Sequence, residues 1–332
     1  TPDTDNDNTP NFQDNDSDND GLTDQEETTG VDDPLTTAVP TGISNPLDPC
    51  DPVSCGLSLT AKVFLGGAYD ELTGMMHDSL RKKNLIPLNQ PYNTLTDYNY
   101  NGTESVNATV FATTGANAIV DWVLVELHDK NNPATVLYKR AALVQRDGDI
   151  VDTDGSSPLF FTGAAVNSYY VSVKHRNHLG VMSAASIAMT TTPAVIDFTS
   201  GITTNYKVAG ARGSDHAQQS FAGNKRALWA GNMANTEALP DPHSGDRVIY
   251  QGPAADVEEA YFVVLLDSTN NIGVLPVHIV ASVYNRADAN MDGKVIYQGD
   301  NADTDVAFFT VSLFPDNANA LPIFVVYEQI PK

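Results

Sequence analysis

The residues best suited to metal chemistry stand late in the chain, in an acidic stretch that opens at Asp288. Asp288, Asn290 and Asp292 alternate there and Gly293 follows, which is how a calcium-binding loop begins. Position 12 of such a loop is usually Glu, but here it is Gly299, and acids just beyond can replace it. Five carboxylates this close repel one another without a cation, which favours metal over an exposed Asn/Asp-rich turn. The candidate calcium ligands are Asp288, Asn290, Asp292, Asp300, Asp303 and Asp305.

A second calcium loop, near the start of the chain, is complete in its residue types. Counted from Asp16, acids fall at positions 1, 3, 5, 9 and 12, and Gly21 falls at position 6. The alternative is a solvated acidic tail, which has no need of the glycine or the final glutamate. The predicted ligands are Asp16, Asp18, Asp20, Asp24 and Glu27, with the carbonyl of Leu22. Candidate ligands of a further ion continue the alternation upstream at Asp3, Asp5, Asp7 and Asp14.

The late acidic stretch is one half of an internal duplication. The sequence VIYQG occurs at Val248–Gly252 and again at Val295–Gly299, 47 residues later, and neighbouring residues match in register. At this interval the first copy has His243 and Gly245 where the second copy has two ligands. We therefore expect one good ion site in the second copy and a weak or empty one in the first.

Charge restricts the partners of the chain. The net charge of the 332 residues is −24 and the pI is near 4.3. No Lys or Arg precedes Lys62, whereas residues 1–51 hold fourteen acids. This balance argues against nucleic acid and anionic membranes as partners and favours cations. No apolar run is long enough for a membrane span, and a start at Thr1 rather than Met is expected of a processed, exported protein.

The two cysteines, Cys50 and Cys55, lie close together and are flanked by prolines. We predict a disulfide between them and hence an oxidising compartment; two free thiols or half of a metal site are the alternatives. Asn101 and Asn107 open glycosylation sequons, which also arise by chance. A secreted, extracellular or cell-surface location follows.

The chain predicts a mainly β fold in four segments. Residues 1–34 form an acidic calcium-binding arm, and residues 35–55 form a proline-rich extended linker. Residues 56–200 form a β-sandwich, because short strands alternate with turn residues. Residues 201–332 form a small duplicated calcium-loop domain. The expected strands, with one helix at Met75–Lys83, are Leu57–Leu65, Val106–Ala112, Ile119–Leu127, Thr135–Val144, Tyr169–Lys174 and Val181–Met189.

Each copy of the duplication is expected to run loop, short strand, turn, helix and strand. Asp256 starts the first helix through a capping box, and Asp303 or Asp305 caps the second. Val248-Ile249 is expected to pair with Val295-Ile296 across a pseudo-twofold axis. The helices and closing strands are expected at Ala260–Leu266, Ala307–Phe314, Val277–Val283 and Ile323–Tyr327.

Three resemblances add to these patterns. Asp14–Glu27 matches DxDxDGxxDxxE and resembles the thrombospondin type 3 repeat, which implies calcium-wrapped backbone with little other secondary structure. The duplicated region resembles a dockerin, although its first loop lacks the acids and each copy carries an extra YQG turn. With segments that begin at Val120, Gln145 and His175, the repeats also resemble large secreted Bacteroidota surface proteins, often labelled hemagglutinin-like. That kinship covers most of residues 57–331 and implies little about activity.

Two further polar clusters have competing interpretations. Asp147–Asp154 holds four carboxylates, which two Asp-Gly turns around a short strand explain, with bridging calcium as the alternative. His175 and His178 could hold zinc, but hydrogen-bonded structural groups at a strand end are the preferred interpretation. No nucleophile motif or glycine-rich phosphate loop accompanies them, so we predict no enzyme.

The sequence favours a calcium-stabilised structural protein, a self-assembling subunit of an extracellular fibre or surface layer. The acidic arm has little reason to fold onto a body that is itself negative. Calcium would instead bridge it to a neighbouring copy, head to tail, giving an open polymer. The alternative is an adhesin that binds surface glycans, which an exposed aromatic platform in a pocket would favour. An enzyme would need a buried His–Asp pair that opens on a cleft.

Overall fold

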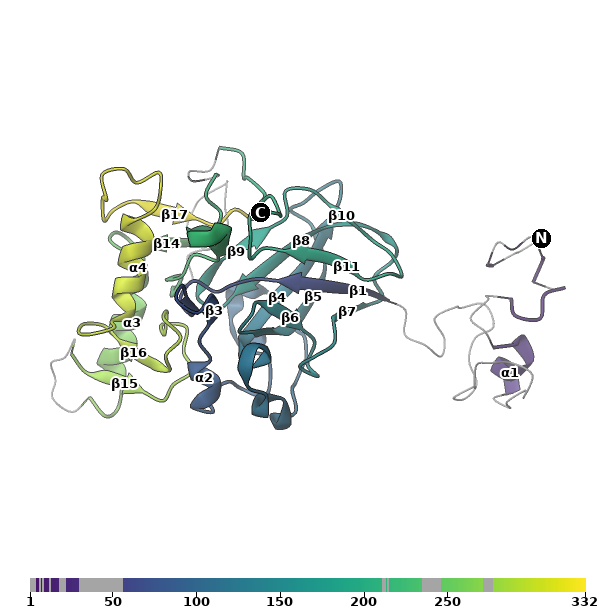
Figure 1. Cartoon of the computed structure of the whole chain (residues 1–332), viewed down its shortest axis with the longest axis horizontal. Helices are drawn as coiled ribbons and strands as arrows, with labels where there is room; N and C mark the ends of the chain where they lie inside the picture. Colours follow the sequence, from purple (N-terminus) through teal and green to yellow (C-terminus); the bar gives the residue numbers. More distant parts are fainter. Residues whose placement is uncertain are drawn as a thin grey trace. The chain divides into compact units, whose positions relative to one another are not determined.

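The computed structural model describes residues 4, 5, 7, 9–11, 13–17, 22–29, 56–210, 213, 215–234, 246–270 and 277–332. The chain forms two compact units, Thr1–Leu57 with Phe161–Val166 and Ser58–Phe160 with Asn167–Lys332. The second unit therefore contains most of both regions predicted at 56–200 and 201–332. Strands dominate, and most of them join one large antiparallel sheet (Figure 1), so the mainly β fold class is confirmed. No helix within the described ranges is long and apolar enough to cross a membrane.

The described helix of the first unit is α1 (Asp24–Thr29). It begins with a capping box at Thr23 and Glu26. The Glu26 carboxylate accepts from the N–H and hydroxyl of Thr23, at 2.8 and 2.9 Å, and the Thr23 hydroxyl accepts from the Glu26 N–H at 3.2 Å. The short acidic loop before α1 is thus tied to the start of a helix.

The second unit is built on a nine-stranded sheet in the order β10-β8-β4-β5-β6-β1-β11, with β7 beside β1 and β9 beside β8. The long central strand β4 is buried along nearly its whole length, on both faces, because its side chains are mostly Val, Leu, Ile and Trp. The pairs are antiparallel except β1 with β11, which run parallel. The strands are β1 (Gly56–Lys62), β4 (Ile119–Asp129), β5 (Val136–Gln145), β6 (Asp149–Val151), β7 (Leu159–Thr162), β8 (Asn167–His175), β9 (His178–Met182), β10 (Ile187–Met189) and β11 (Ala194–Asp197).

Two sequence predictions in this region fail locally. The helix expected at Met75–Lys83 shrinks to α2 (Ser79–Lys82), because Met75-Met76 forms β3 and pairs with β2 (Tyr69–Asp70). The strand expected at Val106–Ala112 is instead a 3-10 helix, since the Asn107 side chain accepts the Thr109 N–H at 3.0 Å and caps it. The remaining short elements are the 3-10 helices Tyr92–Thr94, Thr96–Tyr98, Ala108–Ala112, Gly115–Asn117 and Ala222–Asn224, and the hairpin β12 (Gln219–Phe221) with β13 (Lys225–Ala227).

The duplicated region pairs its strands reciprocally. The front strand of the first copy, β14, pairs with the closing strand of the second, β17, and the front strand β16 pairs with the closing strand β15 of the first. The expected direct pairing of Val248-Ile249 with Val295-Ile296 is therefore wrong, because each segment finds its antiparallel partner after the other copy's helix. The elements are β14 (Arg247–Ile249), α3 (Asp256–Leu266), β15 (Ile279–Ala281), β16 (Lys294–Ile296), α4 (Asp303–Ser312) and β17 (Val325–Tyr327).

One apolar core joins the duplication to the sheet. Leu179 of β9 and Trp229 pack in the same cluster as Val248, Val295 and Val311 from the two copies. The helices α3 and α4 lie beside one another at one end of the sheet (Figure 1), with this core behind them. The calcium-loop candidates are thus held between a rigid sheet and two helices.

Candidate metal centre

The loop of the second copy folds around the buried side chain of Asp288. Its two carboxylate oxygens accept the N–H groups of Asp292 and Gly293 at 2.9 and 2.8 Å. The Asn290 amide oxygen accepts the same Asp292 N–H at 2.9 Å. Met291 and Gly293 take left-handed backbone, with φ of 59° and 82°, which makes the sharp turn. Three of the predicted oxygen ligands therefore lie on one tight loop.

Asp303, the first residue of α4, closes this loop from the helix side. Its carboxylate accepts the N–H groups of Ala289 at 2.7 Å, Asn290 at 3.3 Å and Ile296 at 2.8 Å. The expected helix cap is therefore wrong for Asp303, and Ala302 occupies the cap position without a side-chain bond. An acid beyond position 12 does reach the loop, through hydrogen bonds to its backbone amides.

Burial raises the pKa of two of these carboxyl groups. The pKa of Asp288 rises to about 7 and that of Asp303 to about 8, chiefly because neither is exposed. Asp292 raises the pKa of Asp288 further, and Asp288 that of Asp303, through charge repulsion. One buried oxygen of Asp292 has no hydrogen-bond partner within the described part of the chain. A hard divalent cation would satisfy that oxygen and offset the repulsion.

The other two predicted calcium ligands, Asp300 and Asp305, do not point into the loop of the second copy. Asp300 and Asp305 are exposed, and Asp305 lines a separate pocket. Within the described residues, Asp288, Asp292 and Asp303 do not bring their oxygens within 4.8 Å of one another as a set. Backbone amides occupy the oxygens of Asp288 and Asp303. Loading this site would require those oxygens to turn toward the ion.

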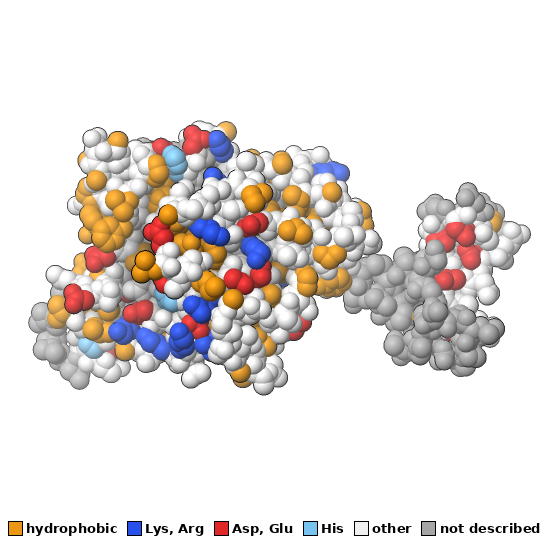
Figure 2. Space-filling model, in the orientation of Figure 1, with side chains coloured by type: hydrophobic (Ala, Val, Ile, Leu, Met, Phe, Trp, Pro, Cys, Tyr) orange, Lys and Arg blue, Asp and Glu red, His pale blue; other side chains and the backbone are white. Residues whose placement is uncertain are grey.

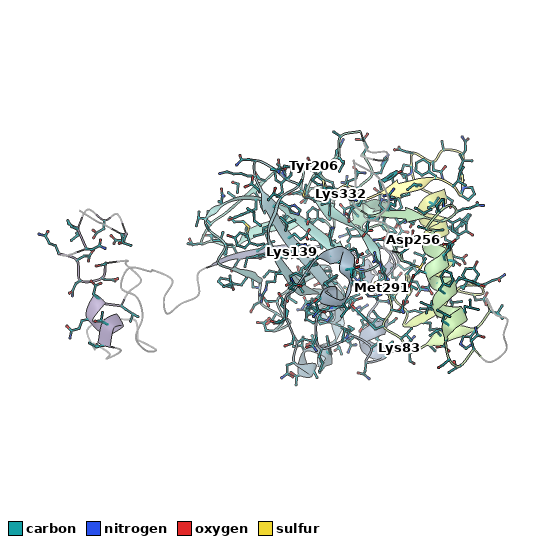
Figure 3. All side chains as sticks on the ribbon, turned by 180° about the vertical axis from the view of Figure 1, so that it is seen from behind. Lys83, Lys139, Tyr206, Asp256, Met291 and Lys332 are labelled. Atoms are coloured by element: carbon teal, nitrogen blue, oxygen red, sulfur yellow. The ribbon has the colours of Figure 1, made fainter. Side chains whose placement is uncertain are left out.

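The first copy repeats this architecture from a different starting point. Asp256 accepts the N–H groups of Met233 at 2.6 Å, Ala234 at 2.8 Å and Ile249 at 2.7 Å, which matches Asp303 amide for amide. Figure 3 labels Asp256 and Met291, one residue from each copy. The residue that corresponds to Asp288 is therefore Asn232, and the first copy carries a net insertion of nine residues within 235–245, since Met233 lies 56 residues before Ala289 and Ile249 lies 47 before Ile296.

This match corrects the alignment at a fixed interval of 47 residues. That alignment had equated the front of the second loop with His243 and Gly245, which lie outside the described residues. The expected capping box at Asp256 is also wrong, because its carboxylate turns inward and Ala255 takes the cap position. Tertiary amides compete successfully with the helix end for this side chain.

A guanidinium stands beside the first copy's acids. Arg286 lies 2.5 Å from Asp97 and 3.6 Å from Asp246, and its Nε donates to the Asn232 carbonyl at 3.2 Å. Asn232 also donates to Asp246 at 3.0 Å. Burial raises the pKa of Asp256 to about 7, while the three amides and Arg286 oppose the rise. The first copy thus contains a built-in cation near its acids.

The arm is described only in part. Asp18 and Asp20, the side chain of Glu27, and both Cys50 and Cys55 lie outside the described residues. Asp24 accepts from the Ser17 N–H and hydroxyl, both at 2.9 Å. Within the described ranges, one group of three acids brings ligand atoms within 4.8 Å, and these are the upstream candidates Asp5, Asp7 and Asp14.

The carboxylates of Asp147–Asp154 are engaged locally. Asp147 accepts the Asp149 N–H at 3.3 Å, and Asp154 accepts two amides of the following turn at 2.8 Å each. Asp152 binds Arg140 through both oxygens, at 2.8 and 2.6 Å. The turns contain Gly148 and Gly155 at positive φ. Two Asp-Gly turns and an ion pair explain the cluster without a metal.

His175 and His178 belong to a buried network. Their Nδ1 atoms lie 2.9 Å apart, and His175 Nε2 lies 3.2 Å from Asp121. Burial lowers the pKa of both histidines, which favours their neutral forms. Arg176 donates to Asp121 at 3.1 Å and stacks on Tyr284, whose hydroxyl donates to the same carboxylate at 2.7 Å.

This network fixes the second copy to the sheet. Asn177 donates to the Asp288 carbonyl at 2.6 Å, and Arg176 donates to the Asn285 carbonyl. His178 Nε2 accepts the Gly67 N–H at 2.9 Å, and a Cβ at Gly67 would collide with the Ala289 carbonyl oxygen. The preferred interpretation, structural groups at a strand end, agrees with these contacts. Sequence reasoning missed Asp121, whose one signal was a charge among the apolar residues that run from Ile119 to Val125.

Comparisons with known proteins supply no relative for this site. No family model, no curated protein and no solved structure matches the chain. The proposals below therefore rest on residues and geometry.

Proposed function

We propose that the chain is a calcium-stabilised structural protein of the cell exterior that assembles with copies of itself. Two apolar patches in matching helix positions carry this proposal. Phe262 and Leu266 of α3 are 49 % and 77 % exposed, and Phe309 and Leu313 of α4 are 54 % and 67 % exposed. Phe309 follows Phe262 by 47 residues, and Leu313 follows Leu266 by the same interval, which is that of the VIYQG repeat. The duplication has therefore kept both patches.

Exposed Phe and Leu side chains on neighbouring helices call for a covering surface. Figure 2 shows hydrophobic side chains gathered at the end of the molecule where Figure 1 places α4. Soluble monomers rarely expose such contiguous apolar area. The two patches carry the same side chains, so the α3 patch of one copy suits the α4 patch of the next. A subunit that uses both patches contacts two neighbours and forms an open chain.

Calcium has a stabilising role in this proposal. Asp288, Asn290, Asp292 and Asp303 hold one ion in the second copy once their oxygens turn toward it, and their attachment to one tight loop supports this assignment. The arm holds another at the residues predicted from Asp16, with Asp5, Asp7 and Asp14 as a further group. The proposal also includes a β-sandwich-like body, which the burial of β4 on both faces supports.

The arm provides a second, calcium-dependent contact between copies, head to tail. Its acids and the absence of Lys and Arg before Lys62 favour a bridging cation. Extracellular location and a Cys50–Cys55 disulfide belong to the same proposal. Exposed Asn101 and Asn107 would be accessible for glycosylation. No reaction is assigned, because His175 and Asp121 are both fully buried.

Electron microscopy of the purified chain in calcium tests the proposal. The double variant Phe262→Ser with Phe309→Ser should abolish filaments, because both contact surfaces lose their largest exposed ring. The control is Leu72→Ser with Ile202→Ser, which removes side chains 99 % and 81 % exposed elsewhere and should leave filaments intact. Filaments that persist in the Phe variant would refute assembly through the patches. Deleting residues 1–34, or adding EGTA, should shorten the filaments if the arm bridges copies.

A further inference from the structure

A pocket of about 310 Å³ is lined by residues of both copies of the duplication, most of them from the second copy between Tyr297 and Asp305. Its wall includes Tyr250 from the first copy and Tyr297 from the second, together with Val257, Gln298 and Asp305. The pocket is distinct from the calcium loops, whose ligands Asp288, Asn290, Asp292 and Asp303 do not line it. It needs both copies, because each contributes one of the tyrosines.

Each tyrosine ring is held by the helix of the other copy. Tyr250 packs against Phe308 of α4 with ring centroids 5.0 Å apart, and Tyr297 packs against Tyr261 of α3 at 5.2 Å. Both rings remain partly exposed. Because the rings are fixed before any ligand arrives, little side-chain freedom is lost on binding.

The lining combines aromatic faces with exposed polar groups. Gln298 supplies amide donors and an acceptor, and Asp305 supplies a carboxylate acceptor. A pyranose ring has the matching chemistry, with apolar C–H faces for the tyrosines and hydroxyls around its edge. An anionic ligand would meet Asp305 and a chain of net charge −24. A wholly apolar ligand would leave the polar lining without partners.

We propose that this pocket binds a neutral saccharide, one or two pyranose rings long, stacked on Tyr250 or Tyr297. The volume lies at the lower end of the range for small-molecule sites, which suits one ring enclosed and a second at the mouth. The proposal goes beyond self-assembly and does not depend on it, because none of the patch residues Phe262, Leu266, Phe309 and Leu313 lines the pocket.

Saturation-transfer NMR with cellobiose, lactose and chitobiose tests the saccharide site on the full chain in calcium. At least one sugar should receive transfer, and the double variant Gln298→Ala with Asp305→Ala should weaken its binding at least tenfold. The matched control is Gln251→Ala with Glu258→Ala, the corresponding exposed residues of the first copy, which do not line the pocket. That control should bind like the wild type.

A parallel pull-down on insoluble cellulose and chitin tests whether the saccharide that the pocket binds is a free sugar or part of a polymeric glycan. Retention that the Gln298 and Asp305 changes abolish would support the pocket as a site for longer chains. Binding to none of the five probes, or binding that survives those changes, would overturn the proposal. The patch variant Leu266→Ser with Leu313→Ser leaves the supporting rings of Tyr261 and Phe308 unchanged and should keep saccharide binding, so failure of one proposal leaves the other measurable.

Discussion

The two copies of the duplication share a backbone framework and differ in how the negative charge of their buried acids is balanced. Asp256 and Asp303 each begin a helix and are fully buried. Each accepts three backbone amides, and the amides stand at corresponding positions of the two copies. The left-handed residues of the turn recur as well, with φ of 55° at Ala254 and 59° at Asn301. The inward Asp is thus architectural in both copies, whatever ion is present.

The difference lies in the cations available to each loop. The second copy gathers Asp288, Asp292 and Asp303, and its nearest guanidinium, Arg176, is shared with Asp121. The first copy has Asn232 at the front and places Arg286 beside its acids. We interpret the first copy as a loop in which a side-chain cation balances the buried acids, as the proposed calcium ion would in the second copy.

The largest effect is expected from removing Arg286. Arg286→Gln should lower the free energy of unfolding by about 3–5 kcal/mol, because the buried side chains of Asp97, Asp246 and Asp256 would lose the guanidinium charge beside them. Urea unfolding, with and without calcium, measures it. Lys207→Gln, which breaks an exposed pair with Asp215, is the control and should change the stability far less, because solvent screens that pair. Equal effects of the two changes would contradict the assigned role.

An intermediate effect is expected from the calcium ligands. Calcium at about 100 times its dissociation constant should stabilise the wild type by about 3 kcal/mol. Asp292→Ala should lose that increment, since it removes the carboxylate with the unpartnered buried oxygen. Asp246→Ala should keep the increment even if it lowers stability in itself. Thermal melts in calcium and in EGTA give the comparison, and loss of the increment in both variants would mean that the ion site is wrongly placed.

The smallest effect concerns pH in the first copy. The pKa of Asp256 is about 7 in the folded chain and about 3.9 when unfolded, so the folded state holds a proton that the unfolded state loses between these values. Wild-type stability should therefore fall as the pH rises through this window. Asp256→Asn removes this pH dependence. Between about pH 5.5 and pH 7, the free energy of unfolding of the variant should therefore rise by about 2 kcal/mol relative to that of the wild type.

Urea titrations in saturating calcium measure this difference, because the second copy's acids are then held by the ion. A difference between variant and wild type that stays constant with pH would show that Arg286 and three amides keep Asp256 ionised. That result would sharpen the comparison in favour of a permanent ion pair in the first copy.

The sequence predicted the types of residue in the second loop and the existence of two copies. It could not predict the register at the front of the first copy, because a fixed interval of 47 residues carries no sign of the insertion within 235–245. Asn232 is a poor signal for the place of Asp288. The Asp residues at the helix starts were expected as caps, and only tertiary structure shows the amides that claim them.

Strand partners were equally beyond the sequence. Val248-Ile249 and Val295-Ile296 have the same apolar pattern, so either pairing would bury them equally well. The strand expected at Val106–Ala112 failed because one local bond from Asn107 outweighed β propensity. The long buried strand β4 was predictable because its pattern is long and almost wholly apolar.

The reciprocal pairing of strands also sets the order in which the chain can mature during synthesis. β14 emerges from the ribosome before its partner β17, with a helix, two strands and a second helix made in between. The edge of β14 therefore stays unpaired until the second copy has been synthesised as far as β17. The two copies become native together as one long-range unit, and a break anywhere after α4 would leave the earlier copy unfinished.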